Sequence, residues 1–172
     1  PINHEKEKNE ILNKYRSLLR SCADKTDKSD KKIIRNAFDL AVNAHKDMRR
    51  KSGEPYIYHP IAVAHIAAKE IGLGSTSIVC ALLHDVVEDT DVTIEEIRNE
   101  FGNSVAMLVD DLTDVSKKED GNRAVRKAMD REHTAKASAA AMVVKAADMI
   151  SNGKDIKEND PHFAKVYIKE MK

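Results

Sequence analysis

The stretch covering residues 78–87 is apolar at nearly every position, yet it contains the dipeptide His84-Asp85. A helix that is apolar on all sides is buried in the core of a protein, because no face of it suits water. Burying an imidazole and a carboxylate is costly unless a cation or hydrogen bonds compensate. Helical spacing places Glu88 one turn after His84 and Asp89 one turn after Asp85. We therefore predict a buried helix that carries two metal ligands, with acid/base carboxylates beside them.

Nearly every other segment of the chain shows the 3.6-residue apolar period of an amphipathic helix. No stretch shows the alternation that is typical of a β-strand, and no internal repeat is present. The pattern predicts an all-α fold, a bundle of about eight to ten helices. The expected helices cover roughly residues 11–19, 34–45, 60–71, 78–87, 93–101, 105–112, 123–136 and 139–150, with a last helix from 161, and polar residues 23–31 separate the first two.

Three local signals indicate where helices begin and end. Thr93, followed three residues later by a glutamate, predicts a capping box. Asn152-Gly153 is typical of a helix C-terminus, which would end the helix that covers 139–150. Asp160-Pro161 predicts an N-cap followed by proline at the first helical position.

The composition restricts the class of protein. The 172 residues are enough for one domain, expected over 1–172, and the last helix is open to continuation beyond Lys172. Lysine plus arginine equals aspartate plus glutamate, 29 each, and there is no Trp, which argues against a general nucleic-acid or membrane-surface binder. No apolar run is long enough to span a membrane. Cys22 and Cys80 lack metal-binding spacing, so a reduced cytoplasmic protein is expected.

The candidate metal ligands are His59, His84, Asp85 and Asp148. A lone histidine before a proline is usually solvated, and a lone aspartate near a helix end is usually exposed or capping. His84-Asp85 is harder to explain in this way, because its neighbours are apolar. His45 lies on an apolar face and is expected to be a core or surface residue rather than a ligand.

The segments around these residues resemble the hydrolase domain of the Rel/Spo alarmone enzymes. The matching segments cover residues 50–61 (RKSGEPYIYHPI), 82–90 (LLHDVVEDT) and 144–148 (VKAAD), together with Asn152. The resemblance covers roughly residues 32–156. The small, single-domain alarmone hydrolases are the most similar members. The chain departs from the family pattern at Ala146 and Gly153, which affects local packing rather than chemistry.

The resemblance implies an HD-domain fold and an H…HD…D set of metal ligands, namely His59, His84, Asp85 and Asp148. It implies hydrolysis of the alarmone (p)ppGpp at its 3′-diphosphate, giving GDP or GTP and pyrophosphate, with Mn²⁺ as cofactor. Glu88, beyond the ligands on the predicted helix, would with Asp89 position and deprotonate the attacking water.

The same reading supplies residues for the substrate. Arg50, Lys51 and Ser52 lie on a basic loop before the first ligand, where cations pair with phosphates and a guanidinium stacks on a purine. Lys145 and Asn152 share one helix face with the last ligand, and the amide has the donor and acceptor needed to bind a base or ribose.

Two alternatives stay open at this point. One is an HD phosphohydrolase for another nucleotide, such as (p)ppApp or NADPH, because the basic loop does not fix the base. The other is an HD domain that binds a nucleotide without turnover, which the loss of a ligand or of Glu88-Asp89 would have favoured. The charged segment 116–133 either reaches phosphates or is a solvated helix, the candidate residues being Arg123, Arg126, Lys127, Arg131 and His133. The oligomeric state is not predicted.

Overall fold

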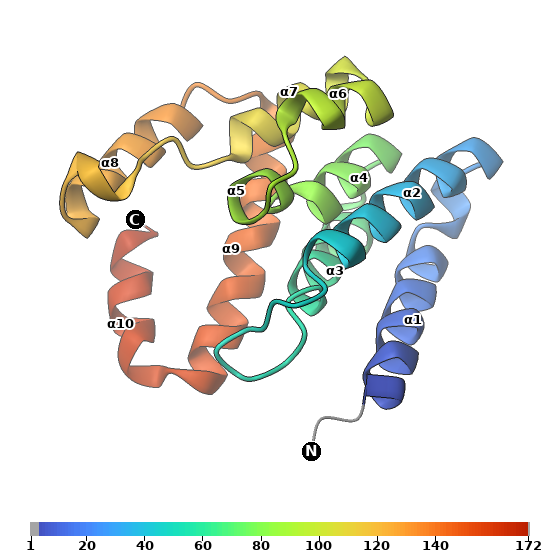
Figure 1. Ribbon diagram of the computed structural model, residues 1–172, viewed down its shortest axis with the longest axis horizontal. Coiled ribbons are helices and arrows are strands. Elements are labelled where there is room, and N and C mark those ends of the chain that lie inside the picture. Colours follow the sequence, from blue (N-terminus) through green and yellow to red (C-terminus); the bar gives the residue numbers. More distant parts are fainter. Residues whose placement is uncertain (1–3, 172) are drawn as a thin grey trace.

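A computed structural model describes residues 4–171 and shows an all-α protein, as predicted (Figure 1). Within those residues, the only strand-like pairing is an isolated bridge between Arg49 and Pro55. The helices are α1 (His4–Ser21), α2 (Lys28–Ala44), α3 (Tyr58–His65), α4 (Ser75–Leu83), α5 (Val86–Asp89), α6 (Ile94–Phe101), α7 (Asn103–Leu112), α8 (Arg123–Thr134), α9 (Ala139–Asn159) and α10 (Pro161–Glu170). Shorter turns are η1 (Ala23–Lys25), the π-helical η2 (Ile66–Ile71) and η3 (Lys118–Asp120).

Helix α4 forms the centre of the core, as its apolar sequence predicts. It packs against α2, α3, α7 and α9, and its residues 78–83 are completely buried. Figure 1 shows α4 enclosed between α2 and the long helix α9. Such a position leaves no solvated face, so side chains at the end of α4 project into the interior.

The prediction of one continuous helix over 78–87 was wrong, because the helix breaks at His84-Asp85. Helix α4 ends at Leu83, and the short α5 begins at Val86. The Nδ1 atom of His84 lies 2.7 Å from the carbonyl oxygen of Ala81, the group that would accept the amide of Asp85 in an uninterrupted helix. The side chain thus competes with the backbone and opens the helix at the two predicted ligands.

The expected end of the penultimate helix at Asn152-Gly153 was also wrong, because α9 continues to Asn159. Gly153 does not adopt the positive φ of a helix C-terminus, and the ring of Tyr167 in α10 lies beside it. The Asn152 side chain bonds to Asp148 one turn earlier instead of ending the helix. The two extra turns bring Asp155 toward the basic loop.

Other boundaries follow the sequence more closely. The capping box at Thr93 is present, and Asp160 caps α10 with Pro161 at its start, as predicted. Helix α2, however, begins inside the segment 23–31 that was expected to separate two helices, because Asp27 forms a capping box of its own. The predicted helix over 60–71 is α3 followed by η2, and Gly72 ends it with φ at 80°.

Helices α8 and α10 lie at the edge of the fold, away from α1 and α2 (Figure 1). Helix α10 packs on α9 and contains no buried residue. A bidentate ion pair between Arg123 and Glu170 joins the start of α8 to the end of α10. None of the helices in residues 4–171 has the length and apolar character needed to cross a membrane.

Candidate metal centre

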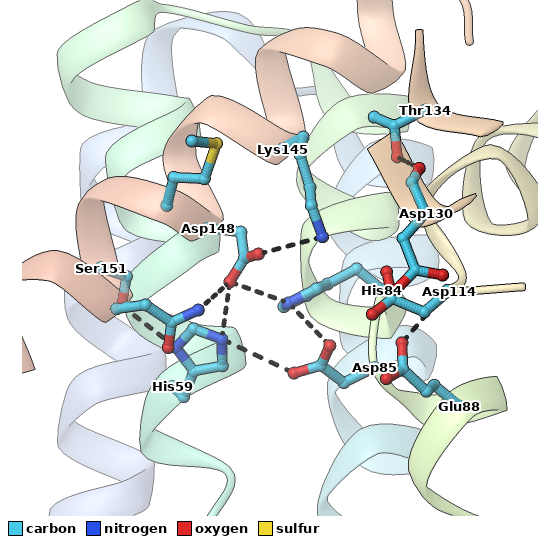
Figure 2. A network of polar contacts seen from close by, with 12 residues as sticks. His59, His84, Asp85, Glu88, Asp114, Asp130, Thr134, Lys145, Asp148 and Ser151 are labelled. Atoms are coloured by element: carbon cyan, nitrogen blue, oxygen red, sulfur yellow. Dashed lines mark hydrogen bonds and ion pairs between the residues drawn. The ribbon is translucent and has the colours of Figure 1, made fainter. Parts of the chain in front are cut away.

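The four predicted metal ligands converge between α3, α9 and the break after α4 (Figure 2). The Nε2 atom of His59 lies 3.1 Å from Asp148 Oδ1 and 3.6 Å from Asp85 Oδ2. The Nε2 atom of His84 lies 3.1 Å from Asp85 Oδ1 and 3.6 Å from Asp148 Oδ1. Both imidazoles and Asp148 are buried, and Asp85 is partly buried. Residues far apart in the chain therefore aim their donor atoms at one point.

The backbone and a serine orient the two imidazole rings. The Nδ1 atom of His84 donates to the carbonyl oxygen of Ala81, which leaves Nε2 facing the carboxylates of Asp85 and Asp148. The Nδ1 atom of His59 lies 3.1 Å from the hydroxyl of Ser151. The buried Nε2 of His84 makes no hydrogen bond to any residue between 4 and 171. This is the arrangement in which histidines bind metals, with one nitrogen held by the protein and the other available.

The electrostatics of the centre favour positive charge. Burial alone would lower the pKa of His84, but the carboxylates of Asp85 and Asp148 outweigh it and hold that pKa well above its ordinary value. Burial would raise the pKa of Asp148, yet the neighbouring imidazoles of His59 and His84 hold it well below its ordinary value. The pKa of Asp85 is likewise lowered, against the effect of burial, chiefly by His84.

These residues fit a divalent metal ion. Donor atoms of His59, His84 and Asp148 all lie within 4.8 Å of one another, and the carboxylate of Asp85 borders the same point. Two imidazoles and two carboxylates provide a mixed nitrogen and oxygen set with enough negative charge to neutralise a dication. Both the mixed set of donors and the lack of a hydrogen bond at His84 Nε2 among the described residues therefore support a metal site.

The two predicted acid/base residues lie beside this centre but outside the ligand cluster. Figure 2 shows the carboxyl group of Glu88 turned toward Asp114, whose backbone amide donates to it at 3.3 Å. Burial raises the pKa of Glu88 to about 7, and the negative charge of Asp114 adds to the effect. Burial also raises the pKa of Asp89, although the nearby hydroxyl of Tyr56 acts to lower it. A carboxyl group that titrates near neutrality suits proton transfer.

Three of the predicted substrate residues join the ligands in one network. The Nη2 atom of Arg50 donates to Asn152 Oδ1 at 3.1 Å and forms an ion pair with Asp155. The amide nitrogen of Asn152 donates to Asp148 Oδ1 at 2.7 Å. The ammonium group of Lys145 lies 3.5 Å from Asp148 Oδ2.

The other two predicted substrate residues lie outside this network. Lys51 is exposed, with its ammonium group 5.6 Å from the ring centre of Phe163 in α10. Ser52 is also exposed, and its hydroxyl lies 3.4 Å from Glu54. Within the described part of the chain, neither side chain contacts a metal ligand, so their assignment to the substrate stays a prediction.

Two cavities adjoin the centre. The larger, of about 610 Å³, reaches His59 and includes Arg50, Ser52 and Asp155 in its wall. The smaller, of about 100 Å³, lies beside Glu88 and is lined by residues from α8 and the loop before it, namely Asp114, Ser116, Arg123, Arg126, Lys127 and Asp130.

Two of the four arginine and lysine side chains of α8 are paired with carboxylates in the described part of the chain. The ammonium group of Lys127 lies 2.8 Å from Asp114, and Arg123 pairs with Glu170. The Nε atom of Arg126 is buried and has no hydrogen-bond partner among residues 4–171. Phosphate binding by this segment stays a prediction.

Three residues that were not predicted as site residues support the centre, namely Tyr56, His45 and Ser151. The hydroxyl of Tyr56 donates to Asp85 Oδ2 at 2.8 Å, and its ring stacks on His45 with 4.7 Å between ring centres. Ser151 follows Asp148 by three residues, so helical spacing was a usable signal for it. No comparable signal existed for Tyr56, because its partner lies on another element.

Replacing Tyr56 by phenylalanine is expected to weaken metal binding about tenfold, since partners that orient a ligand typically contribute that much. The change removes the hydroxyl that fixes Asp85 and keeps the ring that stacks on His45. Titration of the metal-free protein with Mn²⁺ measures the effect. Tyr58→Phe is the matched control, because its hydroxyl bonds Glu10 of α1 instead. Equal affinities in both variants would contradict the role of Tyr56.

Comparison with known proteins identifies the family. A family model described as an HD domain matches residues 37–171. A solved structure titled "A metazoan ortholog of SpoT hydrolyzes ppGpp and plays a role in starvation responses" superimposes with a TM-score of 0.70 at 31% identity, covering 80% of this chain and 82% of that one.

Relatives of two sizes are similar to the chain. The guanosine-3′,5′-bis(diphosphate) 3′-pyrophosphohydrolase MESH1 of Xenopus tropicalis is 41% identical over 139 residues, which cover 77% of this chain and 74% of that protein. A probable GTP pyrophosphokinase of Mycobacterium leprae is 41% identical over 126 residues, but these span only 16% of its length. The chain therefore belongs to the HD-domain family and is a relative of the Rel/Spo alarmone enzymes.

Proposed function

We propose that this protein hydrolyses the guanosine alarmone (p)ppGpp at its 3′-diphosphate and releases pyrophosphate. The observation that carries the proposal is the convergence of His59, His84, Asp85 and Asp148, with Glu88 beside them. The relatives support the same reaction, because MESH1 is named as a 3′-pyrophosphohydrolase and the superimposed structure is titled as a protein that hydrolyses ppGpp.

In the proposed reaction, water attacks the phosphorus bonded to the 3′ oxygen of the nucleotide. That phosphorus–oxygen bond breaks, the 3′ oxygen leaves with the nucleotide and takes up a proton, and the oxygen of the water becomes part of the released pyrophosphate. Glu88 and Asp89 orient the water and accept its proton, because both carboxyl groups lie one turn beyond the ligands and have raised pKa values. Lys145, half-buried beside Asp148, adds positive charge toward the transferred group.

A divalent ion held by the four ligands would neutralise charge on the phosphate oxygens and favour ionisation of the attacking water. We propose Mn²⁺, since it accepts both imidazole and carboxylate ligands, whereas Mg²⁺ prefers an all-oxygen set. Arg50, Lys51, Ser52 and Asn152 are proposed to hold the nucleotide. We also propose that residues 1–172 form one domain. A cytoplasmic location is proposed as well, and the free thiols of Cys22 and Cys80 are consistent with a reducing compartment.

Product analysis tests the reaction. We expect ppGpp to give GDP and pyrophosphate in a single step, because attack at the 3′-linked phosphorus releases both phosphates together. Chromatography of the nucleotides and an enzymatic pyrophosphate assay distinguish this from stepwise release of orthophosphate. The same protein, loaded with Mn²⁺, is offered pppGpp, ppApp and NADPH as matched substrates. Orthophosphate as the first product would contradict the proposed reaction. Turnover of ppApp or NADPH alone would contradict the proposed substrate.

A further inference from the structure

The guanidinium of Arg50 lies in an arrangement that the predicted role of the residue does not explain. Its Nη2 atom donates to Asn152 Oδ1 at 3.1 Å and pairs with Asp155 Oδ2. Because Nη2 carries two hydrogens, these contacts use both of them. The Nε and Nη1 donors make no hydrogen bond to the described part of the chain. One edge of the guanidinium is thus fixed by the protein, and three donors remain for a ligand.

Asp155 is itself fixed on both sides. Its Oδ2 atom faces Arg50, and its Oδ1 atom accepts a hydrogen bond of 2.7 Å from the side chain of Asn159, one turn later in α9. Burial would raise the pKa of Asp155, but the hydrogen bond from Arg50 outweighs it and lowers that pKa. The carboxylate therefore stays charged at neutral pH and holds the guanidinium through an ion pair that is only partly exposed.

The backbone of Arg50 is fixed as well. Its amide donates to the carbonyl of Glu54 at 2.9 Å, and its own carbonyl accepts from the amide of Gly53 at 2.9 Å. Gly53 adopts φ of 88°, a conformation that only glycine enters without strain, so the turn has a defined shape. Only the side chain is then left to be oriented, and Asp155 and Asn152 orient it.

Asn152 links this pair to the metal ligands. Its amide nitrogen donates to Asp148 Oδ1 at 2.7 Å while its carbonyl oxygen accepts from Arg50. Asp148, Asn152 and Asp155 follow one another at intervals of four and three residues, so they lie on one face of α9. The same face that binds the metal therefore also sets the position of Arg50. The side-chain amide of Asn152 keeps a second N–H donor and a second lone pair, so these two bonds leave it able to contact the nucleotide as well.

We propose that Asp155 is a positioning residue that holds the guanidinium of Arg50 in place for the nucleotide. Asn152, which contacts both Arg50 and Asp148, fixes the position of the guanidinium relative to the metal ligands. The inference rests on the proposed function, because it assigns to Arg50 the phosphates or the base of that substrate. An unpaired arginine would have to be ordered when the substrate binds, which costs affinity. Asp155 removes that cost in advance, so it acts on substrate affinity rather than on the chemical step.

The test uses Asp155→Asn, which keeps the shape of the side chain and removes its charge. In Mn²⁺-loaded protein, we expect KM for ppGpp to rise about three- to tenfold while kcat changes by less than about twofold. Metal content, measured by mass spectrometry, should be unchanged. Asp39→Asn is the matched control, because it breaks an exposed ion pair with Arg35 on α2, remote from the centre. Melting curves of all variants report folding, and Asp155→Ala repeats the test with the whole side-chain carboxylate removed.

A double-mutant cycle separates positioning from general stabilisation. If Asp155 acts through Arg50, adding Asp155→Asn to Arg50→Ala should change KM by less than about twofold, because coupled residues are not additive. An unchanged KM in the single variant, or an equal rise in both backgrounds, would overturn the positioning role. Absence of ppGpp turnover by the wild-type protein would overturn the proposed function and this inference with it. The wild-type assay therefore distinguishes the two failures.

Discussion

Asp85→Ala is expected to abolish both metal binding and turnover of ppGpp. Asp85 Oδ1 lies 3.1 Å from His84 Nε2, and Asp85 Oδ2 lies 3.6 Å from His59 Nε2. The change therefore removes a charged ligand that faces both imidazoles. The remaining carboxylate, Asp148, would leave a dication incompletely neutralised. Metal content after dialysis and pyrophosphate release from ppGpp are the measurements.

The matched comparison is wild-type protein that a chelator has stripped of metal. It should be inactive and should recover with Mn²⁺, and less well with Mg²⁺. Melting in the presence of chelator distinguishes loss of the ligand from loss of the fold, since neither protein then contains metal. Full activity of Asp85→Ala without bound metal would disprove the metal centre.

Glu88→Gln is expected to lower kcat by about 10²-fold or more while the metal content stays nearly intact, as is typical for loss of a general base. Glutamine keeps an oxygen that can accept the backbone amide of Asp114, so the local geometry is preserved. Steady-state kinetics and metal analysis on the same sample make the comparison. A rise in KM alone would show that Glu88 binds substrate rather than activates water.

The pH dependence provides a second test of Glu88. Burial raises its pKa to about 7, with Asp114 adding to the effect, so the carboxylate form that accepts a proton is populated only as pH rises through that value. Wild-type activity should therefore increase with pH up to an inflection near or below pH 7, because positive charge bound nearby stabilises the carboxylate. In Glu88→Gln this inflection should disappear. If it persists unchanged, another group sets the rise.

The sequence predicted the helices well where the signal is local. The apolar run of α4 and the caps at Thr93 and Asp160 depend on local sequence alone, and all three are confirmed. The boundaries that failed depend on side chains that bond elsewhere. His84 takes the backbone acceptor of its own helix, and Asn152 bonds to Asp148 instead of ending α9.

For the centre, the sequence identified the residue types and the structure supplied their neighbours. His59 and Asp148 are isolated in sequence, and only the packing of α3 against α9 brings them together. The pairs that cross between elements, Tyr56 with Asp85 and Arg50 with Asp155, carry no periodic signal at all. Such contacts follow from the fold and are not readable from spacing.

The break between α4 and α5 has a consequence for the folding of the protein itself. The ligands of the metal centre come from that break, from α3 and from α9. An ion bound by them would therefore cross-link distant parts of the chain. A ligand that binds only the folded state stabilises it in proportion to the logarithm of the ion concentration relative to the dissociation constant. Cellular supply of the metal would then govern the abundance of the folded protein as well as its rate of turnover.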